Sequence, residues 1–186
     1  RRVLFRSSIN GATQITHAID AFRNLISVYL PVVKRSDVYN QKQNFSFNIK
    51  LNNTDEFFKI FVPSLNIAPA TAISGTLTDS TGFFNLNIQS KRFKYDEIQA
   101  NDLKVNSNID SNLLFTALST SSLIVNDSLL IEEFKVEGWS KQDSAKAMLE
   151  GGNRFDSLDT RFKLGLKAFF GRSEELTSEL QSRFGI

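Results

Sequence analysis

Apolar and polar side chains alternate at every second position over long stretches of this chain. The clearest stretch is 45–51, where Phe and aliphatic residues interleave with Ser46, Asn48 and Lys50. In a β-strand, a period of two places the apolar side chains on one face and the polar ones on the other. The same apolar pattern continues along the chain at Phe84, Leu86 and Ile88, at Ile98, Ala100, Leu103 and Val105, at Leu113, Phe115 and Ala117, at Leu123 and Val125, and at Leu129, Ile131, Phe134 and Val136. It predicts a sheet with one apolar face and one solvated face.

Turn-forming residues separate these segments at short intervals. They lie at 79–82, 110–112, 126–128 and 151–153, and consist of Asp, Asn, Ser, Thr and Gly. Because such residues favour tight turns, we expect hairpin connections and a mostly antiparallel sheet. A one-residue slip in the alternation between Ala100 and Leu103 predicts a β-bulge.

Two stretches show helical spacing instead. In the first, near 17–30, apolar residues from Ile19 to Leu30 recur at intervals of three and four, with Thr16 as candidate N-cap and Pro31 as terminator. The second, near 54–62, carries acidic residues in its first turn, which suit the positive end of the helix dipole. The expected fold class is therefore mainly β with two short helices.

The segments 98–107 and 129–138 are similar to each other. Their shared core is an acidic residue, an apolar residue, Lys and Val, at 102–105 and at 133–136. A hairpin-sized repeat is typical of a stacked β architecture. Chance similarity between two amphipathic strands explains the match equally well.

Both ends of the chain resemble translated DNA sequencing adaptor. Residues 172–182 match one strand of a common adaptor, with Leu176 where the adaptor would give His, and residues 1–7 match the opposite strand. We therefore expect 1–7 and 172–186 to be artefacts, and 8–171 to be a segment of a longer protein. The alternative is a basic arm at the start and a C-terminal helix capped by Ser173.

Composition excludes several function classes. The chain has no Cys and one His, His17, so Cys-ligated metals, thiol nucleophiles and a His-rich metal site have no basis. No phosphate-binding, zinc-protease or nucleophile-elbow motif occurs, so we expect no enzyme activity and no cofactor. Outside the two ends, basic and acidic residues are equal in number, which gives no reason to expect nucleic acid binding.

The order of segments in 8–171 resembles a known family. An amphipathic helix ends in Tyr29-Leu30-Pro31, the alternating strand 45–51 follows, and the helical stretch 53–63 leads to 65–69 and to a strand entry at 73–77. A hairpin array with the 126–129 turn comes next. This order resembles an internal segment of the TamB (translocation and assembly module) family, within the AsmA-like group of Gram-negative envelope proteins.

The resemblance implies a non-enzymatic bridge across the periplasm, anchored in the inner membrane by a part of the protein outside this segment, and reaching an outer-membrane assembly barrel. Its body would be a β-taco, a repeating sheet curled into a groove with an apolar inner face. Such proteins are associated with phospholipid transport and with outer-membrane protein assembly. The expected partners are thus phospholipid acyl chains and, through the parent protein, an outer-membrane barrel.

The predicted groove lining follows from the alternation. It consists of Phe45, Phe47, Ile49, Leu51, Phe84, Leu86, Ile88, Leu103, Val105, Phe134 and Val136. Ordinary core packing under the helices or under a second sheet is the competing interpretation of these residues. A cell-surface β-sandwich or adhesin-like binding module is the alternative function. We assign Trp139 to packing near a strand end.

Overall fold

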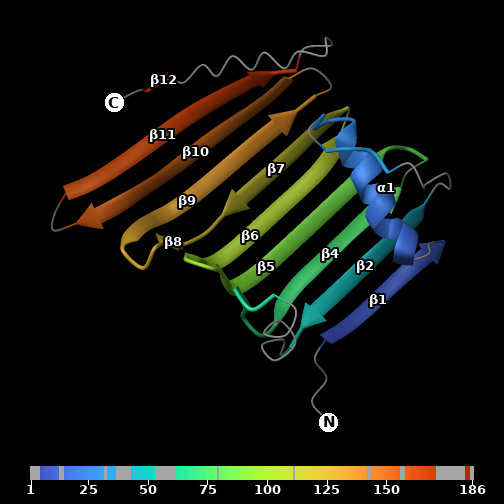
Figure 1. Cartoon of the computed structure of the whole chain (residues 1–186), viewed down its shortest axis with the longest axis horizontal. Coiled ribbons are helices and arrows are strands. Elements are labelled where there is room, and N and C mark those ends of the chain that lie inside the picture. The colour runs from blue at the N-terminus through green and yellow to red at the C-terminus, as the bar shows by residue number, and fades with distance from the viewer. Residues whose placement is uncertain are drawn as a thin grey trace.

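One antiparallel sheet contains every strand among the described residues of this computed structural model (Figure 1). The structure describes residues 5–12, 15–31, 33–36, 43–52, 62–78, 80–110, 112–141, 144–155, 158–170 and 183–184. The strands are β1 (Phe5–Ala12), β2 (Asn44–Leu51), β3 (Leu65–Ile67), β4 (Thr71–Thr78), β5 (Phe83–Tyr95), β6 (Ile98–Asp110), β7 (Leu113–Ser119), β8 (Ser122–Val125), β9 (Leu129–Ser140), β10 (Ser144–Phe155), β11 (Leu158–Phe169) and β12 (Arg183–Phe184).

The strands follow one another across the sheet almost in chain order. The order is β1-β2-β4-β5-β6-β7-β9-β10-β11-β12, with β3 beside β5 and β8 between β6 and β9. Each described strand pair is antiparallel, as the short turns between the alternating segments predict. The expectation of a mainly β, antiparallel fold is confirmed.

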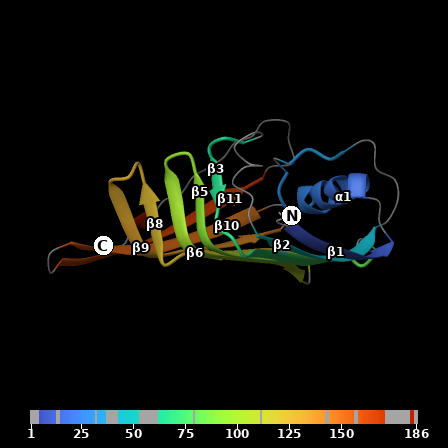
Figure 2. The same ribbon diagram turned by 90° about the horizontal axis from the view of Figure 1, so that it is seen from below.

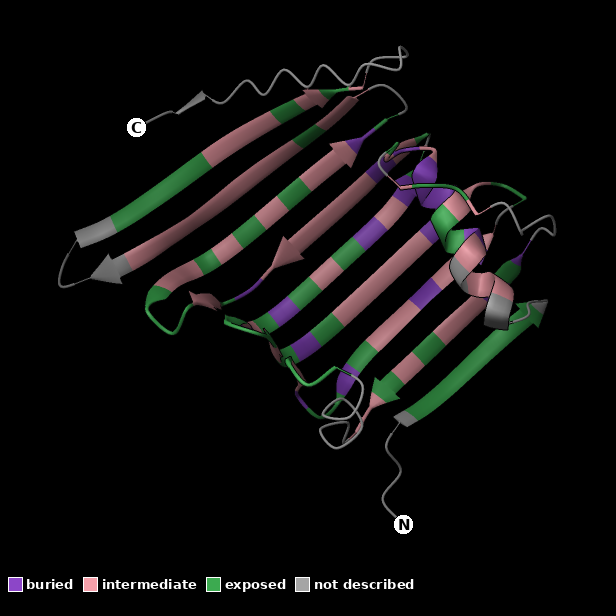
Figure 3. Cartoon of the chain, viewed as in Figure 1, coloured by how far each residue is buried: buried purple, intermediate pink, exposed green. Residues whose placement is uncertain are grey.

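A single helix lies on the described part of the sheet. α1 (Ile15–Ser27) covers one end of β2, β4, β5 and β6 (Figure 1). Its buried side chains pack on the apolar face of the sheet, and the Phe22 ring lies 5.2 Å from the Phe84 ring. The core under the helix consists of Ala21, Leu25, Ile26, Tyr29, Phe45, Leu77, Phe84, Ile109 and Leu114. Figure 3 shows buried residues beneath α1 and a second group, including Ser90, Ala100 and Leu103, toward the other ends of β5 and β6.

The helix predicted near 17–30 is confirmed, but its bounds differ. It begins at Ile15, so Thr16 lies inside the first turn and not before it. It ends at Ser27, because the next amides bond three residues back, Val28 to Leu25 and Tyr29 to Ile26. This tighter turn is common at helix ends, and Pro31 cannot continue an α-helix in any case. Residues 53–61 of the second predicted helix lie outside the described residues.

The far ends of several strands turn out of the sheet plane. Figure 2 shows β3, β8 and the adjoining ends of β5, β6 and β9 rising on the side that carries α1. We call these segments the arm. β10 and β11 continue past the arm without turning (Figure 2).

Three sequence expectations need correction. The bulge expected at 100–103 adds no residue, because the pairing of β5 with β6 keeps one register on both sides of Asp102. Asp102 instead has a left-handed backbone, with φ of 52°. The turn expected at 151–153 is wrong, because these residues lie within β10, where the pairing with β9 shifts register between Glu150 and Gly152.

The third correction concerns β7. Leu114 pairs with Ile109 on the apolar face, so Leu113, Phe115 and Ala117 lie on the opposite face. There the Phe115 ring lies 5.6 Å from that of Trp139, its directly paired neighbour on β9. Aromatic cross-strand pairs of this kind stabilise a sheet without a core beneath them. The alternation in 113–118 was ambiguous because both of its faces are largely apolar.

Candidate apolar binding surface

Eight directly paired residues form an unbroken apolar ladder across the sheet. Directly paired residues share a face, and the ladder runs from β2 to β11. It consists of Ile49, Ile73, Ile88, Val105, Leu118, Val136, Leu149 and Leu164. All eight are half-buried. We call this ladder the apolar row.

The apolar row lies between two raised features. On one side is the ladder of Phe45, Leu77, Phe84, Ile109 and Leu114, which α1 covers. Between that ladder and the apolar row, several partners are small or hydroxylated: Gly75, Ser107, Thr116, Gly138 and Ala147. On the other side the arm rises from the sheet (Figure 2). The sheet face is thus bounded by α1 over β2 to β6 and by the arm at the other ends of β5, β6 and β9.

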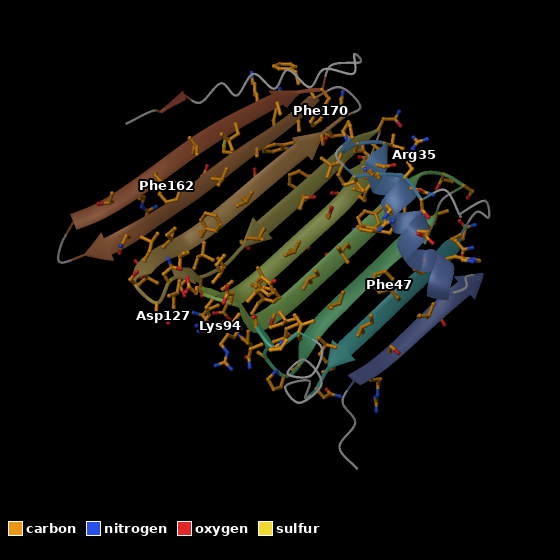
Figure 4. The ribbon with its side chains drawn as sticks, viewed as in Figure 1. Arg35, Phe47, Lys94, Asp127, Phe162 and Phe170 are labelled. Carbon is orange, nitrogen blue, oxygen red and sulfur yellow. The ribbon has the colours of Figure 1, made fainter. Side chains whose placement is uncertain are left out.

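The arm carries an apolar face of its own. Two of its cross-strand ladders are apolar throughout: Ile67, Phe93, Ala100, Leu123 and Ile131, and nearer the tip Leu65, Tyr95, Ile98, Val125 and Leu129. Tyr95, Ile98 and Leu129 are about half exposed. At the tip, Lys94 of β5 forms an ion pair of 3.8 Å with Asp127 of the turn between β8 and β9 (Figure 4).

The arm's apolar face adjoins the face of the apolar row. A Cβ built at Gly151 would lie 2.7 Å from Cγ2 of Ile131 and 3.0 Å from the Phe162 ring, so these side chains meet over Gly151. Phe162 is two residues from Leu164 on β11 and shares its face. Ile131 of the arm therefore lies beside the apolar row.

Two left-handed acidic residues mark the line where the strands turn. Asp102 of β6 has φ of 52°, and Glu133 of β9 has φ of 50°. Each is the acidic residue of the similar segments 98–107 and 129–138, so the two segments share an unusual backbone as well as a sequence pattern. The left-handed residue interrupts the alternation, which accounts for the slip between Ala100 and Leu103 and for the matching one between Ile131 and Phe134.

Polar contacts on the solvated face stabilise the line where the strands turn. The Asp102 carboxylate pairs with Lys91 at 2.6 Å and accepts a hydrogen bond of 3.1 Å from the Ser121 hydroxyl. The Lys91 ammonium, and then Ser121, hold the pKa of Asp102 below its usual value, and Asp102 raises the pKa of Lys91. Thr120 donates to the Asn101 carbonyl, and the Glu133 amide donates to the Ser121 carbonyl.

On several strands, the residue next to the apolar row lies on the opposite face of the sheet and is polar. The residues one position along each strand include Asn48, Ser74, Asn87, Asn106 and Glu137. Asn87 donates a hydrogen bond of 2.6 Å to Asn85 on the same strand. From β2 to β6 the opposite face is therefore polar, whereas at β7 and β9 it also carries Ala117 and the Phe115–Trp139 pair.

All of the predicted lining residues lie on the apolar face, but they divide into three groups. Ile49, Ile88, Val105 and Val136 belong to the apolar row. Phe45, Phe47, Phe84 and Leu86 belong to the core or pack against it under α1 (Figure 4 labels Phe47). Leu51, Leu103 and Phe134 lie near the turn of the strands, where Leu103 is buried and the other two are half-buried. The competing core interpretation is thus correct for the second group.

Sequence reasoning missed four members of the apolar row: Ile73, Leu118, Leu149 and Leu164. The signal was present as alternation in 71–78 and 158–169, but Gly, Thr and Ala interrupt it.

Comparisons with protein-family models, with curated proteins and with solved structures find no match for this chain.

Two further observations bear on the chemistry. Within the described ranges, no group of three or more His, Asp or Glu side chains is arranged to hold a metal ion. No described helix has the length and apolar character needed to cross a membrane. His17 of α1 is half-buried.

Proposed function

We propose that this chain is a non-enzymatic segment of an envelope bridge that binds phospholipid acyl chains along the apolar row. In this proposal the parent protein is anchored in the inner membrane, crosses the periplasm, and reaches an outer-membrane assembly barrel, where it supports both lipid transport and outer-membrane protein assembly. The observation that carries the proposal is the apolar row itself, eight apolar residues in direct succession on a face that is otherwise bounded by α1 and the arm.

The length of the row suits a hydrocarbon chain. Seven steps between neighbouring strands at about 4.8 Å give a row of about 34 Å. A bilayer core of about 30 Å holds two layers of acyl chains, so one chain spans about 15 Å. Burial gains about 0.8 kcal/mol per CH2 group. Since every position of the row is aliphatic, a chain that moves one strand along it exchanges one such contact for another.

The proposed shape is a groove. The arm and α1 would be its walls and the apolar row its floor, which is the curled, taco-like arrangement that the resemblance to the TamB family implies. The turned strand ends and the apolar face of the arm support this interpretation (Figure 2). The alternative β-sandwich needs a second sheet over the apolar face, and the described residues form one sheet.

Photo-crosslinking tests the proposal. Benzophenone side chains placed at Ile88 or Val105, which are directly paired on the apolar row, should capture phospholipid from mixed micelles. The matched controls are Asn87 and Asn106, directly paired one position along the same two strands on the polar face. Mass spectrometry of the adducts identifies the captured molecule.

The two pairs separate the outcomes. Capture at Ile88 and Val105 with little at Asn87 and Asn106 supports the groove. Equal capture on both faces, or capture on the polar face alone, would show that the apolar row is not the lipid surface.

A further inference from the structure

The face of the sheet opposite the apolar row carries a ladder of directly paired residues whose chemistry changes across the strands. It runs from β5 to β11 and consists of Asn85, Asn108, Phe115, Trp139, Lys146 and Lys167. Two amides are followed by two aromatic rings and then by two lysines. Five steps between neighbouring strands at about 4.8 Å give a length of about 24 Å. We call these six residues the mixed ladder.

No described helix or strand covers the mixed ladder. α1 and the arm both rise on the other face of the sheet, the one that carries the apolar row (Figure 2). The amides and the aromatic side chains of the ladder are half-buried, and its two lysines are exposed. Gly165 lies on the same face, diagonal to Lys146, and a Cβ built there would meet nothing within 4 Å. The surface beside the lysines is therefore open to a ligand from solvent.

The two aromatic rings in the middle of the ladder hold each other in place. The centroids of the Phe115 and Trp139 rings are 5.6 Å apart, and their planes are tilted by 44°. On the amide side, Asn108 is the direct partner of Phe115. A sugar has apolar C–H groups on the faces of its ring and hydroxyl groups around its edge, so it suits a surface that offers aromatic rings beside amides.

The lysines place two positive charges side by side at one end of the ladder. Like charges on directly paired residues, as at Lys146 and Lys167, repel each other. Neither lysine forms an ion pair with a carboxylate of the described residues. The nearest acidic residue by register is Glu137, which is diagonal to Lys146. An anionic group of a ligand between the two ammonium groups would offset their repulsion.

We propose that the mixed ladder binds an oligosaccharide that carries a carboxylate on a terminal sugar. The carboxylate lies between the two lysines, the adjoining sugar rings stack on the two aromatic rings, and hydroxyl groups bond to the amides of Asn85 and Asn108. Because this surface and the apolar row are on opposite faces, the inference is independent of acyl-chain binding.

Two other anionic partners fit the ladder less well. A single-stranded nucleic acid carries a negative charge at every nucleotide, but the lysines lie at one end of the ladder and Glu137 is two residues from Trp139 on the same face. An anionic membrane would have to dehydrate polar side chains on the same face, such as Ser46, Thr76 and Asn85. A sugar chain with one acidic end matches both the polar end and the charged end of the ladder.

Two tetrasaccharides test the proposal. Glucuronosyl-xylotriose carries one carboxylate on its terminal sugar, and xylotetraose has the same number of rings and no charge. Each is titrated into the full chain and followed by calorimetry, while the emission of Trp139, the single tryptophan, reports on stacking at its ring. The acidic tetrasaccharide should bind about tenfold or more tightly than xylotetraose, as a charge-assisted hydrogen bond implies.

Lys146→Gln and, independently, Lys167→Gln should remove that preference and leave the affinity for xylotetraose unchanged. Lys50→Gln is the matched control, since it removes one exposed cation from the same face of the sheet on β2, away from the ladder. Trp139→Leu should weaken the binding of both sugars. Thermal unfolding of each variant shows whether the sheet is intact, and the exposed lysines carry the test if Trp139→Leu does not fold.

The competing partners are separate arms of the same experiment. A thymidine tetranucleotide or phosphatidylglycerol vesicles that bind through the two lysines, while glucuronosyl-xylotriose does not bind, would replace the sugar by a nucleic acid or a membrane. Equal affinity for the two sugars, or a preference that survives both lysine variants, would show that the lysines hold no carboxylate. Absence of binding by either sugar overturns the site. Lipid crosslinking at Val105 is independent of all these results, because it reports on the other face.

Discussion

At the scale of single residues, two glycines of neighbouring strands show how unevenly the sheet is packed. Gly151 lies where the arm meets β10, and an added Cβ would clash with Ile131 at 2.7 Å and with Phe162 at 3.0 Å. Gly165 of β11 has nothing within 4 Å of the same position. The first glycine is required by a close side-chain approach, and the second is not.

Gly151→Ala should therefore destabilise the chain by about 1–3 kcal/mol, because Ile131 or Phe162 must leave its position. Gly165→Ala is the matched control and should stabilise by about 0.5–1 kcal/mol, since alanine loses less backbone entropy in a strand. Urea denaturation measures both free energies of unfolding. Equal effects of the two substitutions would show that Ile131 does not rest on Gly151.

The ion pair at the turn of the strands makes a prediction about pH. Since Lys91 and then Ser121 lower the pKa of Asp102, the pair favours the folded state above the ordinary carboxyl pKa and loses this effect as pH falls through the lowered value. Lys91→Gln should raise the pKa of Asp102 towards its usual value. An NMR titration of the carboxyl carbon measures this, with Lys50→Gln as a charge-matched control that should leave Asp102 unchanged.

At the scale of elements, β6 and β9 turn by the same device. Each has an acidic residue with positive φ, and each continues with an apolar residue, Lys and Val on the main sheet. A left-handed backbone is unfavourable for most L-residues and worst for β-branched ones. The cost is offset by contacts with the segment that joins β7 and β8, including the bond from the Glu133 amide to the Ser121 carbonyl.

Substitution at Glu133 tests this device. Glu133→Val and Glu133→Asn both remove the contact with Arg161, but asparagine tolerates a left-handed backbone and valine does not. The valine variant should thus be less stable than the asparagine variant by about 1–2 kcal/mol. Thermal unfolding measures the difference. If the two variants have the same melting temperature, the left-handed backbone at 133 is not under strain.

Much of this architecture follows from the sequence, and the exceptions have physical reasons. Strict alternation at 45–51 and 84–88 gave the correct face, because polar and apolar residues are cleanly separated there. In 113–118 both faces are largely apolar, so the pattern could not show whether Leu113 or Leu114 lies on the apolar face of the sheet. Gly151 and Gly152 suggested a turn, but pairing with β11 keeps them in a strand. The sequence predicts which residues are apolar but not which ones α1 covers, because that depends on contacts between distant segments.

At the scale of the whole molecule, a buried hydrogen bond joins the segment that follows α1 to the end of β9, 111 residues further along the chain. The Ser140 hydroxyl of β9 donates to the Tyr29 carbonyl at 2.5 Å, just beyond the end of α1. Between these two residues lie the central strands of the sheet, whose pairing is continuous from β2 to β9. The helix, the apolar row and the arm are thus parts of one connected structure, and we expect it to unfold as one.

Ser140→Ala tests this connection. It leaves the Tyr29 carbonyl buried without its partner, so the chain should lose about 1–3 kcal/mol of unfolding free energy. Trp139, the single tryptophan, lies next to Ser140 and reports on β9 by fluorescence, while far-UV circular dichroism reports on the whole sheet and α1. In the wild type and in the variant, the two signals should change at the same urea concentration, as a two-state transition requires.

Ser128→Ala, at an exposed turn position, is the control and should leave the midpoint of the urea transition unchanged. A fluorescence transition that separates from the dichroism transition would mean that β9 unfolds independently of α1, and the groove proposed between α1 and the arm would then not be a single rigid unit.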